Sequence, residues 1–397
     1  MSHSNIVKPK GFIGMVCIAV FFGMTAMSLP LPVLPRHLVE RSHFDMQAVG
    51  WMMAAQFLST LISRPWAGRL ADRRGPRYAV SAGLFAMLLS AVGYCLATLD
   101  VPVNAAVGLI LSARILAGLG EGLVVTGGGS WAVALAGLDK AGWAMSWIGL
   151  AMFCGLSAGA AIGASFGLRA VAGLMAVATI TGLCVAGQVP TTGKRTTETS
   201  IPLLQVISAI WWPGLTLGLA TFGLGAVSSF AVLLFDMRGW RGGGLAIALF
   251  GMGHVSARLF LSRLADRANI ARLLVALILL EGVGLLLLSV ASAPAAALVG
   301  AALAGFGFSM VFPMMAVPLL RSVQENARGM AIALYDATFD IAMGAAGITC
   351  GWVSQRWSLP VSFGVASLVV STSAVVAMRS VRSHEATKTI RSGIDNG

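Results

Sequence analysis

Charged residues are scarce in this chain. Asp, Glu, Lys and Arg make up 11% of its 397 residues, whereas hydrophobic residues make up 57%. An ordinary soluble domain carries roughly a quarter charged residues, so this composition excludes a chain whose whole surface faces water. The five cysteines form no C-x-x-C pair. We also find no phosphate-binding loop, metal-ligand cluster or nucleophile motif, and therefore expect no enzyme, no catalytic residue, no cofactor, no metal site and no ATP-driven pump.

Long apolar runs dominate instead. A membrane-spanning helix needs about 20 apolar residues, and the runs are too long and lack the period-two alternation of strands. We expect an all-α membrane protein with twelve transmembrane helices. They are placed near residues 11–33, 47–67, 78–99, 103–136, 142–165, 170–189, 211–234, 244–263, 271–290, 294–319, 329–352 and 360–379.

A short motif occurs twice. Residues 64–73 read RPWAGRLADR and residues 258–267 read RLFLSRLADR, which is six identities in ten at an offset of 194. That offset spans six helices, as a parallel duplication of a six-helix unit predicts. We expect an N-terminal bundle at 1–189, a cytoplasmic linker at 190–210, a C-terminal bundle at 211–380 and a cytoplasmic tail at 381–397.

The basic residues predict the orientation. With the N-terminus in the cytoplasm, 18 of the 27 Lys and Arg fall in cytoplasmic segments and six in outer loops. Cytoplasmic loops of membrane proteins are enriched in these residues, so both termini are expected inside. The net charge of +12 then reflects topology, and no nucleic-acid partner is expected.

The first copy of the repeat continues through Gly68, Arg69, Asp72, Arg73, Gly75 and Arg77. It resembles the signature G-x-L-a-D-r-x-G-r-r of the major facilitator superfamily, and Arg114-Ile-Leu-Ala-Gly-Leu-Gly120 resembles the superfamily's helix-4 motif. Nearly the whole chain is similar to the YhhS-type bacterial exporters, as in Leu29-Pro-Leu-Pro-Val-Leu-Pro35 and Phe339-Asp340-Ile-Ala-Met-Gly344. The resemblance implies a multipass protein of a bacterial inner membrane that is driven by protons.

Helix 5 departs from the antiporter pattern of that superfamily. Its glycines, Gly155, Gly159 and Gly163, recur every fourth residue, but Ala161 stands where a proline is expected. A stripe of small residues lets helices pack closely, and packing is the favoured interpretation. The missing proline weakens the inference of antiport.

Charged residues inside the spans are the candidates for function, because a charge at mid-bilayer costs about 2.5–3.5 kcal/mol on insertion scales. Arg114 and Glu121 lie two turns apart on one face of helix 4. Glu121 is expected to bind a proton, and Arg114 to hold an anionic group or to alter the proton affinity of Glu121. A structural ion pair is the alternative.

Asp336 and Asp340 are stacked on one face of helix 11, where two carboxylates resist joint ionisation. We expect proton coupling or substrate binding at Asp340, whereas Asp336 could instead face the inner side or cap a kink. For Glu281 on helix 9 and His254 on helix 8, structural roles are favoured.

The duplicated loop is expected to act as a conformational gate. Asp72 and Asp266 lie among basic residues, and topology alone does not explain paired aspartates. A charge network of this kind can lock one conformation and break in the other. The predicted gate also includes Arg64, Arg258 and Arg267.

The favoured function is a secondary transporter that exports a small organic compound by alternating access, in exchange for protons. A proton-coupled importer of a sugar or organic acid remains an alternative. A membrane sensor is disfavoured, because fewer than twenty residues follow Arg379. Expected partners are the substrate, protons and membrane lipid, and the protein is expected to be a monomer.

Overall fold

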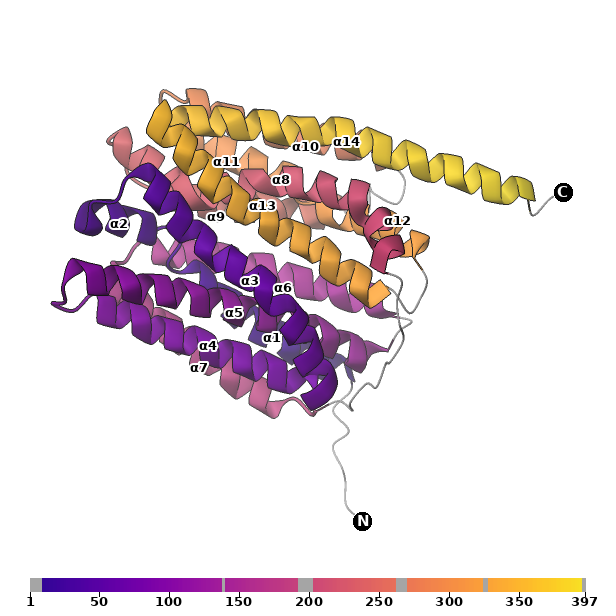
Figure 1. Cartoon of the computed structure of the whole chain (residues 1–397), viewed down its shortest axis with the longest axis horizontal. Coiled ribbons are helices and arrows are strands. Elements are labelled where there is room, and N and C mark those ends of the chain that lie inside the picture. The colour runs from indigo at the N-terminus through magenta and orange to yellow at the C-terminus, as the bar shows by residue number, and fades with distance from the viewer. Residues whose placement is uncertain (1–8, 138–139, 192–202, 262–269, 324–327, 395–397) are drawn as a thin grey trace, which may run out of the picture. The chain divides into compact units, whose positions relative to one another are not determined.

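The computed structural model describes residues 9–137, 140–191, 203–261, 270–323 and 328–394. These residues form almost only α-helices, with no strand in the described ranges (Figure 1). The helices are α1 (Pro9–Ser28), α2 (Leu34–Ser42), α3 (Met46–Arg74), α4 (Pro76–Ala97), α5 (Val103–Ala136), α6 (Ala141–Gly163), α7 (Leu168–Gln188), α8 (Leu203–Met237), α9 (Gly243–Leu261), α10 (Ile270–Val290), α11 (Pro294–Phe308), α12 (Val311–Ser322), α13 (Arg328–Arg356) and α14 (Leu359–Ile394).

Most of these helices are suited to a bilayer. Among the described residues, eleven helical stretches are long and apolar enough to cross a membrane, with α11 and the first part of α12 forming one of them. Helix α3 has 29 residues, which at 1.5 Å per residue also exceeds the hydrocarbon thickness of about 30 Å. The expected all-α membrane fold with twelve spans is confirmed.

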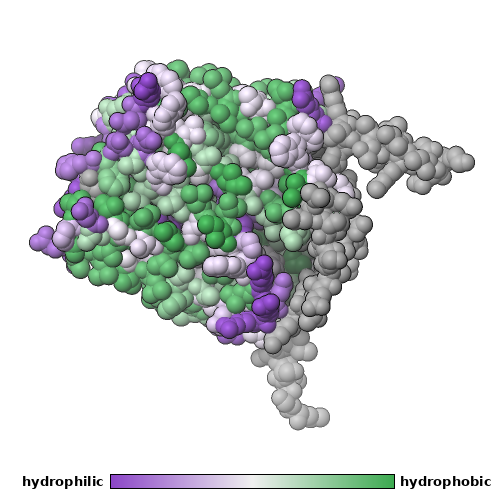
Figure 2. Space-filling model, in the orientation of Figure 1, coloured by the Kyte–Doolittle hydropathy of each residue, from purple (hydrophilic) through white to green (hydrophobic). Residues whose placement is uncertain are grey.

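Apolar side chains also lie on the outside of the helices. Figure 2 shows hydrophobic residues over the broad flanks of the helices and hydrophilic residues gathered toward their ends. Large exposed side chains include Trp211, Phe260 and Leu368, which are 62%, 75% and 70% exposed. Lipid is the solvent that accommodates so much exposed apolar surface.

The chain divides into two compact units. The first holds Met1–Phe44 and Ala55–Thr197, and the second holds Asp45–Ala54 and Glu198–Gly397. The start of α3 belongs to the second unit because it crosses α13 closely there. A Cβ atom on Gly50 would overlap the carbonyl oxygen of Gly347, and the Met46 backbone N–H donates to Oε1 of Gln355 at 3.2 Å.

Prolines explain two differences from the expected spans. The first expected span, 11–33, is α1 only to Ser28, and turns carry the chain through Pro30 and Pro32 to α2. The span at 294–319 is divided between α11 and α12 at Ser309 and Met310. Pro313 has no N–H to donate to the carbonyl of Ser309, which weakens a continuous helix at that point.

Two helices extend into segments that the sequence assigns to connections. Helix α8 begins at Leu203, inside the expected linker 190–210, and α14 continues to Ile394 through the expected tail at 381–397. Figure 1 shows the C-terminal part of α14 projecting past the ends of the neighbouring α10 and α8. Helices α10 and α14 nevertheless pack against each other.

Candidate functional site

Small residues bring α3 and α4 unusually close to α5. A Cβ atom on Gly118 would overlap the carbonyl oxygen of Gln56 on α3, and one on Gly120 would lie 2.6 Å from the carbonyl oxygen of Gly83 on α4. Such contacts require glycine, because any side chain would separate the helices. Ser59 on α3 adds a hydrogen bond from its Oγ to the carbonyl of Ile115 at 2.8 Å. Helix α5 is therefore fixed on two sides within the first unit.

Glu121 is the central polar group of this packing. Its side chain is 3% exposed, and its Oε2 accepts a hydrogen bond from Nε2 of Gln56 at 3.0 Å. The Thr60 hydroxyl lies 3.2 Å from the same oxygen and shares its one proton between this oxygen and the carbonyls of Gln56 and Gly118, both at 3.1 Å. Hydrogen bonds to a carboxylate are stronger than neutral ones. The site thus holds a carboxyl group in a fixed position, away from water, with donors already aimed at one oxygen.

Neither donor to Glu121 is among the residues predicted from the sequence. Gln56 and Thr60 lie four residues apart on α3, and both side chains are fully buried. A detectable signal existed, since two polar residues one helical turn apart in an apolar span share a face. What the sequence alone does not give is the pairing of that face with α5.

Arg114, the second predicted residue of α5, is fully buried. It lies two turns before Glu121, which corresponds to about 10 Å along the helix axis. Tyr94 on α4 is also fully buried and interacts electrostatically with Arg114. Arg114 carries its charge at any physiological pH. The first unit therefore places a permanent cation and a titratable carboxyl on one helix.

The second unit contains the other predicted carboxylates. On α13, Asp340 is 1% exposed and Asp336 is partly buried. The neighbouring Tyr335 is fully buried and donates from its hydroxyl to the carbonyl of Phe312 at 3.1 Å, which attaches α13 to α12. This bond fixes the turn of α13 that carries Asp336, and Asp340 lies one turn further along the helix.

His254 on α9 occupies a packed position in the same unit. Its ring is fully buried and lies 5.6 Å from the ring of Phe308, centroid to centroid. Its carbonyl accepts a hydrogen bond from Oγ of Ser309 at 2.7 Å, at the break between α11 and α12. These contacts agree with a structural role for His254.

The structure describes the first copy of the predicted gate, at the end of α3 and the start of α4. Helix α3 ends at Arg74, and Gly75 has φ of 99°, a left-handed conformation that glycine adopts without strain. Arg77, at the start of α4, donates from Nη2 to the carbonyl of Gly187 at 2.7 Å. That carbonyl belongs to the last turn of α7, where helical carbonyls lack internal donors.

Other gate residues differ in exposure. Arg64 is 8% exposed, whereas Arg69, Asp72 and Arg73 are exposed. Gly68 lies one position before Arg69, and a Cβ atom added to it would meet no atom within 4 Å. In the second copy, Arg258 on α9 is partly buried. Asp266 and Arg267 lie outside the described residues.

The glycine stripe of α6 faces α1. Cβ atoms on Gly159 and Gly163 would overlap the carbonyl oxygens of Thr25 and Leu29, and Oγ of Ser28 donates to the carbonyl of Gly155 at 3.3 Å. Helices in lipid associate through such close backbone approaches. No proline is needed for this contact, so the alanine at position 161 does not disturb it.

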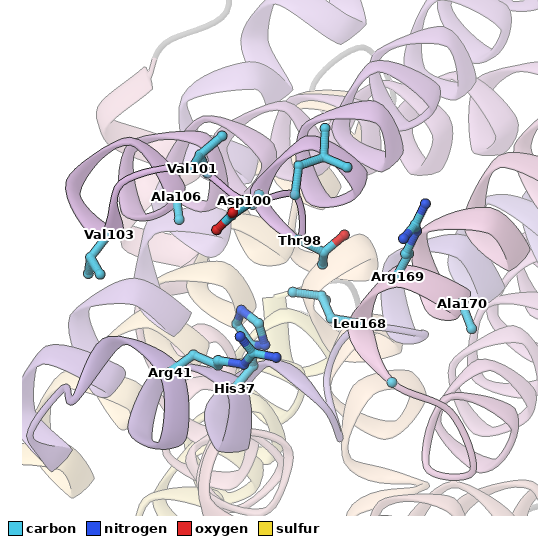
Figure 3. Close-up of a pocket in the computed structure, with 13 residues that line it drawn as sticks. His37, Arg41, Thr98, Asp100, Val101, Val103, Ala106, Leu168, Arg169 and Ala170 are labelled. Carbon is cyan, nitrogen blue, oxygen red and sulfur yellow. The ribbon is translucent and has the colours of Figure 1, made fainter.

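A separate pocket of about 730 Å³ lies within the first unit. Figure 3 shows His37 and Arg41 side by side on α2, with Thr98 and Asp100 on the turn between α4 and α5 across from them. Burial lowers the pKa of His37, and nearby Arg41 lowers it further, while Glu40 raises it. None of the predicted site residues lines this pocket, so it is distinct from the Glu121 site.

A bundle of membrane-length helices with buried charged residues inside each unit is typical of a polytopic membrane protein in which those residues have a function. Residues 16–267 and 241–394 match the sequence profile of the Major Facilitator Superfamily. The chain belongs to this superfamily and is a multi-pass membrane transporter, not an enzyme.

Relatives with similar sequences support the same assignment. The chain is 32% identical over 365 residues to the uncharacterized MFS-type transporter YhhS of Escherichia coli K12, covering 90% of each chain. It is 31% identical over 378 residues to the uncharacterized MFS-type transporter STM4428 of Salmonella typhimurium, covering 93% of this chain and 96% of the relative. The expected resemblance to YhhS-type proteins is confirmed.

Solved structures show the same fold at low identity. The D-xylose-proton symporter superposes with a TM-score of 0.76 at 17% identity, covering 94% of this chain and 97% of that one. The human organic anion transporter MFSD10 superposes with a TM-score of 0.71 at 16% identity, covering 93% of this chain and 99% of that one. At these identities the likeness concerns the fold alone.

Proposed function

We propose that the protein exports a small organic compound by alternating access, in exchange for protons. The observation that carries this proposal is the setting of Glu121, a carboxyl group that is 3% exposed and accepts hydrogen bonds from Gln56 and Thr60. A buried ionisable group in a membrane helix is by default a functional candidate. Its two donors favour the ionised form, while burial favours the protonated form, so the group is suited to alternate between them.

Arg114 is the proposed contact for an anionic group of the substrate. Its guanidinium is fully buried on the same helix as Glu121, and arginine pairs well with carboxylate and phosphate groups. A bound anion and an ionised Glu121 would compete for the positive potential of Arg114. Protonation of Glu121 would then favour one ligand state of Arg114 over the other, which is a physical basis for exchange.

In the second unit, Asp340 and Asp336 are proposed to contribute to coupling or substrate binding. Asp340 is the stronger candidate because it is 1% exposed, whereas Asp336 is only partly buried. The loops with Asp72 and Asp266 are proposed to control which side of the transporter opens. Arg77 supports this proposal for the first loop, because its bond to Gly187 connects that loop to the end of α7.

The proposed location is a bacterial inner membrane, with both termini in the cytoplasm. This orientation rests on the excess of Lys and Arg in alternate connections. We propose that the transporter works as a monomer surrounded by lipid, with one N-terminal and one C-terminal six-helix bundle divided near residues 190–210.

An importer of a sugar or organic acid is the second candidate. It is favoured by the fold likeness to a D-xylose-proton symporter, whereas the likeness to an organic anion transporter agrees with an anionic substrate at Arg114. Export and import would use the same residues and the same alternating-access cycle, so the direction of proton-linked flux distinguishes them.

The test uses purified protein in lipid vesicles with an imposed pH gradient. A thermal-shift screen of small organic anions, sugars and neutral amphiphiles first supplies a ligand, whose flux is then measured in both gradient directions. We expect the compound to move opposite to the proton gradient. Movement in the same direction as the protons would replace export by import, and flux that ignores the gradient would contradict proton coupling.

Two variants test the residues of the coupling proposal. Glu121→Gln and Asp340→Asn keep side-chain shape but cannot release a proton, and each is expected to abolish the response of flux to the pH gradient while ligand binding persists. Retained proton-linked flux in both variants would show that neither carboxyl carries the proton. Glu40→Gln, at an exposed position on α2, serves as the control for removing a carboxylate.

A further inference from the structure

Glu281 lies near the middle of α10 in the second unit, and its side chain is fully buried. Neither Oε1 nor Oε2 accepts a hydrogen bond from any group that the structure describes. This differs from an ordinary buried carboxylate, which is paired with a cation or accepts several hydrogen bonds. A structural role of the kind favoured by the sequence would require such partners.

Backbone and apolar side chains from three other helices lie next to Glu281. A Cβ atom on Gly223 of α8 would lie 2.5 Å from Oε1 of Glu281 and 3.3 Å from Cγ2 of Val370 of α14. A Cβ atom on Gly307 of α11 would lie 2.5 Å from the backbone nitrogen of Glu281. The carboxyl group therefore rests against the bare backbone face of α8, in a space that glycine leaves open.

Charged groups are distant along every helix of this compartment. Helix α11 contains no titratable residue, α8 has none before Asp236, and α14 has none before Arg379. Asp236 is 13 residues beyond Gly223, which is about 20 Å along a helix. On α10 itself, Arg272 is nine residues before Glu281, or about 13 Å.

Helices α12 and α9 also carry charged or titratable residues in the second unit. Helix α12, which also packs on α10, contains Arg321 as its only charged residue, next to its last position. Helix α9 carries His254 and Arg258, and the His254 ring packs on Phe308, which follows Gly307 on α11. Helix α11 thus lies between the α9 residues and the compartment of Glu281.

We propose that Glu281 is a proton-binding site, occupied in the described conformation and emptied when α8 or α14 moves away from α10. Among the described residues, an ionised carboxylate in this compartment would have neither a cation nor a hydrogen-bond donor to stabilise it. Ionisation therefore requires a conformation that admits water, and proton release is linked to helix movement. Its use in transport rests on the proposed proton-coupled function, but the binding site itself does not.

Infrared difference spectroscopy of the full-length protein in lipid vesicles tests the site without a transport assay. We expect a protonated-carboxyl C=O band that is lost in Glu281→Gln, and that converts to carboxylate absorption in the wild type as the pH is raised. Absence of the band would mean that Glu281 is ionised and would overturn the proposal. A band that persists at every pH at which the protein stays folded would overturn it too, since Glu281 would then be permanently neutral.

A pair of glycine variants on α8 tests the location of the proton. Gly223→Ala places a methyl group against Oε1 of Glu281 and is expected to shift the frequency of the carboxyl band. Gly218→Ala is the matched control, because a Cβ atom there would meet only ordinary contacts, 3.5 Å from the Thr338 carbonyl oxygen and 3.8 Å from Ala342. An identical band in both variants would contradict the assigned site.

The transport assay separates this proposal from the function that it deepens. If flux proves independent of the pH gradient while the Glu281 band titrates, proton-coupled transport fails and the proton site stands. If flux follows the gradient and no Glu281 band exists, the proton site fails and the function stands.

Discussion

Glu121 and Glu281 are both buried glutamates in apolar helices, but their surroundings are opposite. Glu121 accepts hydrogen bonds from Gln56 and Thr60 and shares α5 with the permanent cation Arg114. Glu281 accepts none from the described residues and faces Gly223 and apolar side chains. Burial alone therefore does not define the chemistry of a membrane carboxyl group.

The difference indicates how each carboxyl can exchange a proton. At Glu121 the donors remain in place when the charge appears, so ionisation needs little rearrangement of the protein. At Glu281 no such stabilisation exists in the described conformation, so ionisation requires rearrangement. A preorganised site suits competition between proton and substrate, whereas an unpartnered site suits coupling between proton and helix movement.

The largest expected effect comes from replacing each glutamate with leucine. Glu121→Leu leaves the Gln56 amide buried without its acceptor and is expected to lower the free energy of unfolding by about 1–3 kcal/mol. Glu281→Leu replaces an unpartnered polar group with an apolar one and is expected to raise it by about 1–3 kcal/mol. Thermal unfolding of both variants in the same detergent measures the contrast. Changes of the same sign would remove the distinction drawn between the two sites.

Removal of a donor sharpens the description of Glu121. Gln56→Leu eliminates the 3.0 Å hydrogen bond to Oε2, and bonds to charged groups contribute about 1.5–3 kcal/mol. We expect a loss of stability in this range and a changed pH dependence of flux. Gln188→Leu is the control, because its amide donates to the Cys184 carbonyl of its own helix at an exposed position. Equal losses in both variants would mean that the bond to Glu121 has no special value.

The sequence predicts the fold well because a chain that crosses lipid must do so as long apolar helices. Helix α5 spans Val103–Ala136, the same residues as the fourth expected span, since its apolar run has clear turn residues at both ends. The turns through Pro30 and Pro32 end α1 before the expected span ends, and the break near Pro313 divides another expected span. Whether a proline kinks or ends a helix depends on the packing around it.

The site was only partly predictable, because a hydrogen bond between helices depends on their register. Arg114, Glu121 and Asp340 are conspicuous as charges in apolar runs, and all three are buried. Gln56 is less conspicuous, and its pairing with Glu121 depends on the close approach that Gly118 permits. Glu281 is recognisable in the sequence as a charge in an apolar run. Its lack of hydrogen-bond partners among the described residues depends on how four helices pack together, so no single helix predicts it.

Arg77 extends the comparison to a hydrogen bond at an exposed position. Its hydrogen bond to the Gly187 carbonyl joins α4 to the end of α7, but water competes for both partners. Arg77→Ala is expected to cost about 0.5–1.5 kcal/mol, less than removing the buried donor Gln56. Arg69→Ala, at an exposed position in the same loop, is expected to change thermal stability by less. A cost as large as that of Gln56→Leu would show that burial does not control the strength of these bonds.

The smallest expected effect concerns His37, a half-buried group on α2. Its pKa lies below the ordinary value of 6.5, mainly through burial and next through Arg41. At pH above 6.5 the folded and unfolded states both hold neutral histidine. As the pH falls below 6.5, the unfolded state binds the proton first, so stability is lost until the pH passes the lower pKa of the folded state. His37→Gln is expected to flatten this part of the stability profile. Thermal unfolding of the wild type and of this variant across the pH range measures the slope, and an unchanged slope in His37→Gln would mean that the pocket in Figure 3 does not oppose protonation of His37.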